Sequence, residues 1–231
     1  MQNVEVSVAQ RVRQVREAIA FAAARADRDP SEVTLVAVSK SVGRDAVDDA
    51  SAAGIRHFGE NRVADAARKF AVSLPAGSVL HLIGQLQSNK ARPAVALFDL
   101  IESVDRPSLI EALEKEADRI GRPIPVLLQV NVAGEARKAG CGLQNAPALA
   151  SRLGASPAFD LRGLMTIAPL VDDAETVRPG FRELRRLRDR LREAGGSLRL
   201  DILSMGMSND FVVAVEEGAT QVRVGRALFG P

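Results

Sequence analysis

The sequence predicts an α/β protein, a (β/α)8 TIM barrel with an extra N-terminal helix, from three observations. Short runs rich in β-branched and other apolar residues recur along the 231 residues, and segments of helical periodicity separate them. The apolar runs are nearly continuous, as in parallel strands that are buried on both faces. Eight such runs alternate with helical segments, which is typical of a closed barrel. A doubly wound open sheet is the alternative, but no GxGxxG segment follows the first strand.

The elements follow in order from these patterns. An amphipathic helix is expected at 5–27, in the place left by the helix that is missing after strand eight. The strands are expected in TLVAVSK (34–40), HFGEN (57–61), VLHLIG (79–84), DLIESV (99–104), IPVLLQVN (124–131), LRGLMTI (161–167), LDILSMG (200–206) and TQVRVG (220–225). The intervening helices are expected at 44–53, 62–71, 89–98, 107–120, 144–154, 176–194 and 210–217. No long linker divides the chain, so we expect residues 1–231 to form a single domain.

Composition narrows the classes of partner. The 31 basic and 29 acidic side chains leave a net charge of only +2, which gives no reason to expect nucleic acid or an anionic membrane. Cys141 is the only cysteine, which excludes an intrachain disulfide and fits a reducing compartment. Arg11, Arg13, Arg16 and Arg25 interrupt the N-terminal segment, so it predicts neither a signal peptide nor a membrane span. We expect a soluble, cytoplasmic protein with a small-molecule partner.

Lys40 ends the first predicted strand, where lysine is unusual. Active sites of TIM barrels lie at the C-terminal ends of the strands, so its ammonium is expected in the mouth of the barrel. Hydrophobic walls and cationic neighbours would favour the free amine there, which can condense with an aldehyde or ketone. The alternative is an ordinary surface lysine just past a strand, and position alone does not separate the two.

Two C-terminal loops predict an anion site. LSMGMSNDF (203–211) leaves strand seven and brings Ser208 just before an apolar helix, where it could bind an anion or serve as an ordinary N-cap. VRVGRALFG (222–230) places Gly225 directly after strand eight, where backbone amides can approach an oxyanion. Phosphate sites in TIM barrels are often built from these two loops. Together with Lys40, they suit a phosphorylated aldehyde such as pyridoxal 5′-phosphate (PLP).

Arg223 is the candidate for the group that faces the pyridine nitrogen of PLP. It lies two residues before Gly225, on the same face of the last predicted strand. Because an arginine keeps its proton, it would donate to the ring nitrogen and hold that nitrogen unprotonated. The ring would then be a poor electron sink.

Six segments together resemble the YggS/PROSC-type pyridoxal phosphate homeostasis proteins, which are related to the barrel domain of bacterial alanine racemases. They are AVSK, FGEN, HLIGQLQSNK, GLMTI, LSMGMSND and VRVGRALFG, in this order between residues 33 and 230. The resemblance implies a barrel like the alanine racemase N-terminal domain, PLP fold type III. It also implies a protein that carries PLP as a Schiff base on Lys40 for intracellular PLP homeostasis, without committed amino-acid chemistry.

The resemblance also assigns the site residues. It implies that Asn61 approaches the ring hydroxyl, that Ser208 with the backbone at Gly225 and Arg226 binds the phosphate, and that Arg223 faces the pyridine nitrogen. Two residues depart from the family pattern: Arg62 stands where many relatives have tyrosine, and Arg226 where a small hydroxyl residue is common.

An enzyme remains the alternative, as a PLP-dependent amino-acid racemase or decarboxylase. In alanine racemases the second base is a tyrosine from another domain, whereas this sequence has no tyrosine, and its eighth strand ends so near Pro231 that no second domain is expected. A lysine-dependent aldolase acting on a phosphosugar is a third possibility. We expect a non-enzymatic, monomeric carrier, with PLP-dependent apo-enzymes as candidate partners and neither nucleic acid nor membrane among them.

The two histidines weigh less in this argument. His57 and His81 are the only histidines, and with one cysteine they do not make a convincing zinc site. We expect His81 to pack in or near the barrel mouth without a catalytic role. In the helix at 176–194, Leu184, Leu187 and Leu191 form one stripe with the arginines elsewhere, as on the outer helix of a barrel, although that basic face leaves nucleic-acid binding as a weaker alternative.

Overall fold

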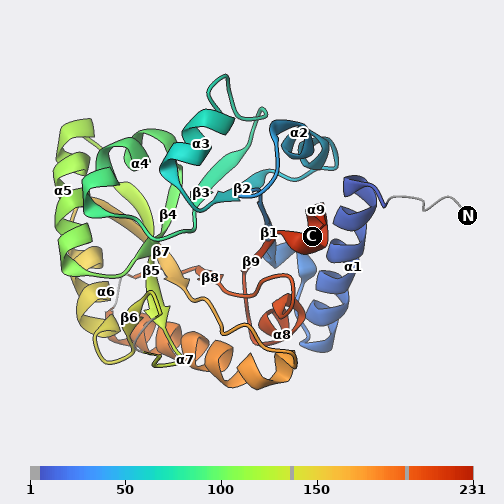
Figure 1. The fold of residues 1–231 in the computed structure, drawn as a ribbon. Coiled ribbons are helices and arrows are strands. Elements are labelled where there is room, and N and C mark those ends of the chain that lie inside the picture. Colours follow the sequence, from blue (N-terminus) through green and yellow to red (C-terminus); the bar gives the residue numbers. More distant parts are fainter. Residues whose placement is uncertain (1–5, 136–137, 196–197, 231) are drawn as a thin grey trace, which may run out of the picture.

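The computed structural model describes residues 6–135, 138–195 and 198–230, and its strands run around a ring with the helices outside (Figure 1). The strands are β1 (Thr34–Val38), β2 (His57–Glu60), β3 (Val79–Leu82), β4 (Leu100–Val104), β5 (Ile124–Asn131), β6 (Cys141–Gly142), β7 (Phe159–Met165), β8 (Ile202–Ser204) and β9 (Gln221–Val224). The α-helices are α1 (Val8–Arg25), α2 (Arg44–Ala52), α3 (Val63–Lys69), α4 (Ala91–Leu97), α5 (Pro107–Ile120), α6 (Ala146–Ala155), α7 (Arg178–Gly195), α8 (Phe211–Glu216) and α9 (Arg226–Phe229).

Strand pairing closes the barrel and confirms the predicted fold class. The strands follow the order β4, β3, β2, β1, β9, β8, β7, β5, and β4 also pairs with β5, which closes the ring. Every pairing is parallel. The two-residue strand β6 pairs with β5 outside this ring and was not predicted. The alternative prediction of an open, doubly wound sheet is therefore wrong.

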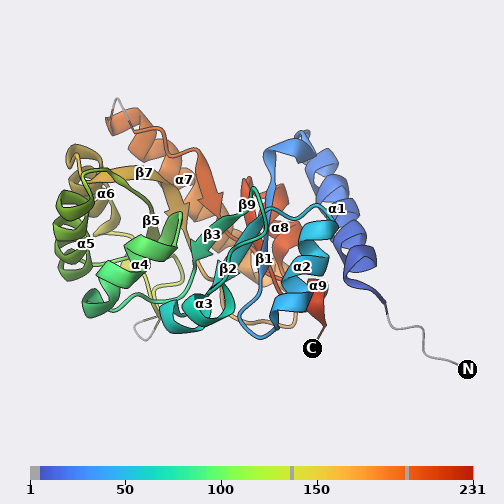
Figure 2. The ribbon, with the colours of Figure 1, turned by 90° about the horizontal axis from the view of Figure 1, so that it is seen from above.

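Helix α1 occupies the position predicted for the extra N-terminal helix. It packs against α2, α8 and α9, and both views place it on that flank of the barrel (Figures 1 and 2). Ser7 caps it in a capping box with Gln10. Its buried face repeats every three or four residues, at Val12, Val15, Ile19, Ala22 and Ala23. The short helix α9 follows β9 and was missed by the sequence prediction.

Apolar side chains fill two separate regions. The main core lies between the strands and the outer helices, and α7 contributes the predicted stripe of Leu184, Leu187 and Leu191 to it. A much smaller cluster holds Leu100, Leu127 and Met165, with Ile202 packed against it. These four residues come from β4, β5, β7 and β8 and are separate from the main core, so they form an apolar layer inside the barrel.

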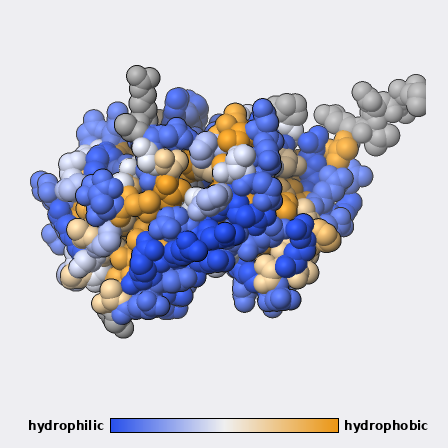
Figure 3. Space-filling model, turned by 90° about the horizontal axis from the view of Figure 1, so that it is seen from below, coloured by the Kyte–Doolittle hydropathy of each residue, from blue (hydrophilic) through white to orange (hydrophobic). Residues whose placement is uncertain are grey.

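The outer surface is largely polar. Hydrophilic residues dominate the face in Figure 3, which includes α7, the helix along the lower side of Figure 1. Three arginines of α7, Arg178, Arg182 and Arg185, pair with the buried carboxylate of Glu217 after α8. Part of the arginine-rich face of α7 thus forms ion pairs within the protein. None of the helices in the described part of the chain is long and apolar enough to cross a membrane.

Candidate functional site

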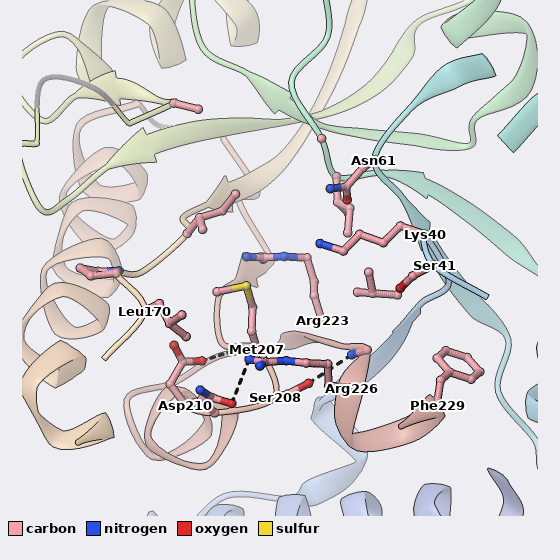
Figure 4. A pocket seen from close by; sticks show the side chains of 18 of the residues that line it. Lys40, Ser41, Asn61, Leu170, Met207, Ser208, Asp210, Arg223, Arg226 and Phe229 are labelled. Carbon is pink, nitrogen blue, oxygen red and sulfur yellow. Dashed lines mark hydrogen bonds between the residues drawn. The ribbon is translucent and has the colours of Figure 1, made fainter. Parts of the chain in front are cut away.

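A cavity of about 670 Å³ opens at the C-terminal ends of the barrel strands. Its walls come mainly from the segments that follow β1, β2, β3, β7, β8 and β9. The structure brings all the predicted site residues together in its lining: Lys40, Asn61, Ser208, Arg223, Gly225 and Arg226 (Figure 4).

Lys40 lies two residues beyond β1, so the prediction that it is the last residue of the strand is wrong. The ladder of β1 ends at Val38, although the amide of Ser39 still donates to the carbonyl of Gly59 at 3.0 Å. The lysine therefore stands in a turn above the strand. Figure 4 shows its amine reaching toward the guanidinium of Arg223.

A buried ion pair fixes the backbone just before Lys40. Ser39 Oγ donates to Glu60 Oε1 at 2.8 Å, and Lys69 Nζ donates to the same oxygen at 2.7 Å and to the carbonyl of Ser39. Glu60 is fully buried at the end of β2, and Lys69 ends α3. This cluster ties β2 and α3 to the segment that carries Lys40.

Arg223 lies at the floor of the cavity and is only 3% exposed. Its Nη1 donates to Ser204 Oγ at 2.5 Å and its Nη2 to the carbonyl of Thr166 at 2.7 Å. Burial lowers the pKa of the guanidinium, while the charges of Glu102 and Asp210 oppose that change. The pKa of an arginine side chain is ordinarily so high that the guanidinium remains a cation. Its Nε has no hydrogen-bond partner among the described residues.

Ser208 faces β9 and does not cap the helix that follows it. Its Oγ accepts from the amides of Gly225 and Ala227, each at 3.3 Å. The N-cap of α8 is Asp210, so the interpretation of Ser208 as an ordinary N-cap is wrong. Distances of 3.3 Å are long for N–H···O bonds, so these amides are held only weakly by the hydroxyl.

Gly206 directs the chain between β8 and Ser208. Its φ of +93° lies in the left-handed region. A Cβ at this position would lie 2.6 Å from the Cβ of Ala214 in α8. Only glycine permits the turn at this packing distance, so it sets the position of Ser208.

Asn61 and Gly84 form the opposite part of the cavity wall. Asn61 directly follows β2, and Gly84 comes two residues after β3. A Cβ on Gly84 would lie 2.1 Å from the backbone oxygen of Asn61. The absence of a side chain at Gly84 is therefore required to bring the two loops together.

Arg226 reaches the cavity at its solvent side. Its side chain is exposed, and its Nη2 donates to Asn209 Oδ1 at 3.3 Å. The neighbouring Asp210 is buried, and this burial raises the pKa of its carboxyl group. The hydrogen bond from the Met207 amide and the charge of Arg223 act in the opposite direction but do not cancel the rise. The guanidinium of Arg226 thus lies with the loop after β8.

Sequence analysis missed two groups of polar residues at the site. Gln129 of β5 lines the cavity, is 1% exposed, and neither amide atom has a partner among the described residues. Glu102 of β4 and Ser204 of β8 lie in the barrel interior and connect to Arg223. The one available signal was a carboxylate inside the apolar run DLIESV, because glutamate is rarely fully buried without a partner.

Other chemistry finds no support at this site. Cys141 is buried, and burial together with the charge of Asp105 raises the pKa of its thiol to about 12, so it is not a thiolate at neutral pH. Within the described ranges, no group of three or more His, Cys, Asp or Glu side chains is placed to hold a metal ion. His81 is buried inside the barrel and bonded to Glu102, outside the cavity lining.

Comparison with known proteins agrees with this architecture. The family model described as alanine racemase, N-terminal domain, matches residues 12–231. A pyridoxal phosphate homeostasis protein of Pseudomonas aeruginosa is 42% identical over 224 residues, which are 97% of this chain and 95% of that protein.

Solved structures give the same result. PipY of Synechococcus elongatus is 41% identical, and the matches cover 97% of this chain and 100% of that one, with TM-scores of 0.86 without PLP and 0.85 with PLP bound. Alanine racemase from Corynebacterium glutamicum is 17% identical, with a TM-score of 0.68 over 98% of this chain and 62% of that one, which shows the shared fold alone. The chain therefore belongs to the alanine racemase N-terminal domain family and, within it, to the pyridoxal phosphate homeostasis proteins.

Proposed function

We propose that this chain binds PLP in the cavity, joined as a Schiff base to Lys40, and serves PLP homeostasis as a cofactor carrier. The observation that carries the proposal is the meeting of Lys40, Arg223 and the Ser208 loop around one cavity. The family membership supports it, since PipY binds PLP in a closely similar fold.

The residues present fit this cofactor. When bound, PLP supplies an aldehyde that a lysine amine can capture. The weakly held amides of Gly225 and Ala227 could donate instead to phosphate oxygens, beside the hydroxyl of Ser208. The Nε of Arg223 has a hydrogen to donate to the ring nitrogen. The unpartnered amide of Gln129 in the lining is what a site for a polar ligand would contain.

Each proposed role follows from these groups. Lys40 provides the amine, and Arg223 donates to the ring nitrogen and keeps it unprotonated. Ser208 with the backbone at Gly225 and Arg226 holds the phosphate, while Asn61 approaches the ring hydroxyl.

The linkage is tested by chemical reduction. The nitrogen of Lys40 adds to the aldehyde carbon, one water leaves, and a C=N bond forms. Borohydride then delivers hydride to that carbon, a solvent proton reaches the nitrogen, and the product is a stable secondary amine. We expect peptide mapping to find the label on the AVSK peptide. Lys40→Ala should lose the visible absorbance and Lys90→Ala should keep it, whereas a label on Lys90 or Lys138 would refute the assignment.

A carrier is favoured over a racemase or decarboxylase by two features. An arginine facing the ring nitrogen makes PLP a poor electron sink, and this sequence offers no tyrosine as a second base. General acid–base assistance is typically worth about 10²- to 10⁴-fold in rate, so a protein without the second base should racemise amino acids slower by about that factor. We expect transfer of PLP to a PLP-dependent apo-enzyme on mixing, without appreciable solvent-deuterium exchange at the α-carbon of alanine or serine. Exchange at ordinary enzyme turnover would favour the racemase.

A further inference from the structure

A chain of short hydrogen bonds runs through the barrel interior and ends at Arg223. His57 Nδ1 and His81 Nε2 are 2.9 Å apart, and His81 Nδ1 lies 2.7 Å from Glu102 Oε1. Ser204 Oγ is 2.6 Å from Glu102 Oε2 and 2.5 Å from Arg223 Nη1. This series of hydrogen bonds links β2, β3, β4, β8 and β9, and so crosses from one side of the closed barrel to the other.

The chemistry of the groups fixes the direction of the bonds between His81 and Arg223. Arg223 Nη1 and Gln221 Nε2, the latter 2.9 Å away, can only donate to Ser204 Oγ. Ser204 has one hydrogen, so it donates that hydrogen to Glu102. A carboxylate can only accept, so His81 donates to Glu102 through Nδ1, and the remaining hydrogen bond of the chain joins His81 Nε2 and His57 Nδ1. Glu102 therefore receives hydrogen bonds from three sides, including one from Gln221 Nε2 at 2.7 Å.

Glu102 is an anion although it is fully buried. Burial raises its pKa, but the hydrogen bond and charge of His81, the charge of Arg223 and the hydrogen bond from Ser204 together hold the pKa below its usual range. Asp210, beside the cavity, is the other carboxylate whose charge acts on Arg223. A cation this deeply buried needs a counter-charge, and Glu102 supplies it one hydroxyl away.

We propose that Glu102 is the positioning residue of Arg223. Acting through Ser204, it holds the guanidinium at the floor of the cavity and balances its charge, and it thereby sets the acid–base behaviour of PLP linked to Lys40. This inference rests on the proposed function. Without the negative charge of Glu102, the positive potential at the site rises, and the protonated linkage gives up its proton at lower pH.

The test is an absorbance titration of the PLP-loaded protein against pH. Glu102→Gln keeps the shape of the side chain and removes its charge, and we expect the midpoint of the titration to fall by roughly one pH unit or more. Ser204→Ala breaks the bridge and keeps the charge, so a smaller shift in the same direction is expected. Glu217→Gln is the matched control, a buried carboxylate whose arginine partners lie on α7, and its midpoint should equal that of the wild type.

The two variants keep the outcome decisive. An unchanged midpoint in PLP-loaded Glu102→Gln would overturn the proposal, and if that variant does not fold, an unchanged midpoint in Ser204→Ala would do so.

A second readout uses the protein without PLP. The buried guanidinium of Arg223 should give slowly exchanging side-chain signals in ¹H–¹⁵N spectra, assigned by their loss in Arg223→Lys. We expect Glu102→Gln to broaden or shift these signals and Glu217→Gln to leave them in place. A wild-type protein that takes up no PLP refutes the proposed function, whereas guanidinium signals that are unaltered in Glu102→Gln refute the role of Glu102.

Discussion

Replacing Lys69 by methionine tests the ion pair that stands behind Lys40. The side chain of Lys69 is 12% exposed and that of Glu60 is fully buried, with 2.7 Å between Nζ and Oε1. Oε2 of Glu60 has no hydrogen-bond partner within the described ranges, so Lys69 and Ser39 compensate the carboxylate through Oε1 alone. Lys69→Met keeps an unbranched side chain, one atom shorter, and leaves the buried anion without a cation.

The expected cost is large for a single substitution. Removing one partner of a buried ion pair typically destabilises a protein by about 3–5 kcal/mol. The double variant Glu60→Met/Lys69→Met should recover most of that loss, because apolar replacements of buried pairs are often close to neutral. About 1 kcal/mol should remain lost, since the hydroxyl of Ser39 then has no acceptor.

Urea unfolding followed by far-UV circular dichroism measures this effect, since the sequence has neither tryptophan nor tyrosine for fluorescence. Lys115→Met is the control: this lysine is exposed on α5, and its replacement should change stability by less than about 0.5 kcal/mol. The reasoning is refuted if Lys69→Met costs no more than Lys115→Met. In the folded fraction we also expect weaker PLP binding, because the segment before Lys40 loses a tether.

Three further predictions follow from the site. Ser208→Ala removes a hydrogen bond to a charged group, worth about 1.5–3 kcal/mol, so equilibrium dialysis should show PLP affinity falling about tenfold or more while pyridoxal binding is unchanged; an equal fall for both would contradict the phosphate role. Gly84→Ala places a Cβ against the backbone of Asn61 and should cost about 1–3 kcal/mol in urea unfolding, whereas wild-type stability would show that the loops can separate. Burial and the charge of His81 lower the pKa of His57 in the folded protein. Below pH about 6.5, His57 is therefore protonated in the unfolded chain while it is still neutral in the folded one. Stability is thus fully present above that pH and falls as the pH drops toward the lower folded pKa, by at most about 1.4 kcal/mol per pH unit, and His57→Gln should flatten the fall between pH 7.5 and 5.5.

The alternation of apolar runs and helical segments was sufficient to predict the barrel, but element ends depend on hydrogen bonds that the pattern does not contain. Lys40 continues an apolar run, yet the ladder of β1 ends at Val38. Helix α9 has four residues, too few to show any periodicity. Asp210, and not Ser208, occupies the N-cap position of α8, while the hydroxyl of Ser208 contacts the amides that follow β9, which the local sequence does not indicate.

Some residues of the candidate site could also be predicted from the sequence, and others could not. Residues at strand ends and in glycine-containing loops were predictable, since barrel geometry places those positions in the mouth. Glu102 and Ser204 were not, because nothing in their own strands indicates which polar groups of other strands they contact. Glu102 and Ser204 are themselves 102 residues apart in sequence, so only the closed sheet reveals that they meet.

The polar interior of this barrel is explained better by the cavity than by stability. TIM barrels usually fill their interior with layers of branched apolar side chains, and here one such layer is followed by the chain from His57 to Arg223. Removing one charge from a buried pair is costly, but replacing all its members by apolar residues often is not. Folding alone would therefore tolerate an apolar interior. A ligand whose ring nitrogen needs a fixed cationic donor would not, and the anion that keeps this cation in place must then be buried with it.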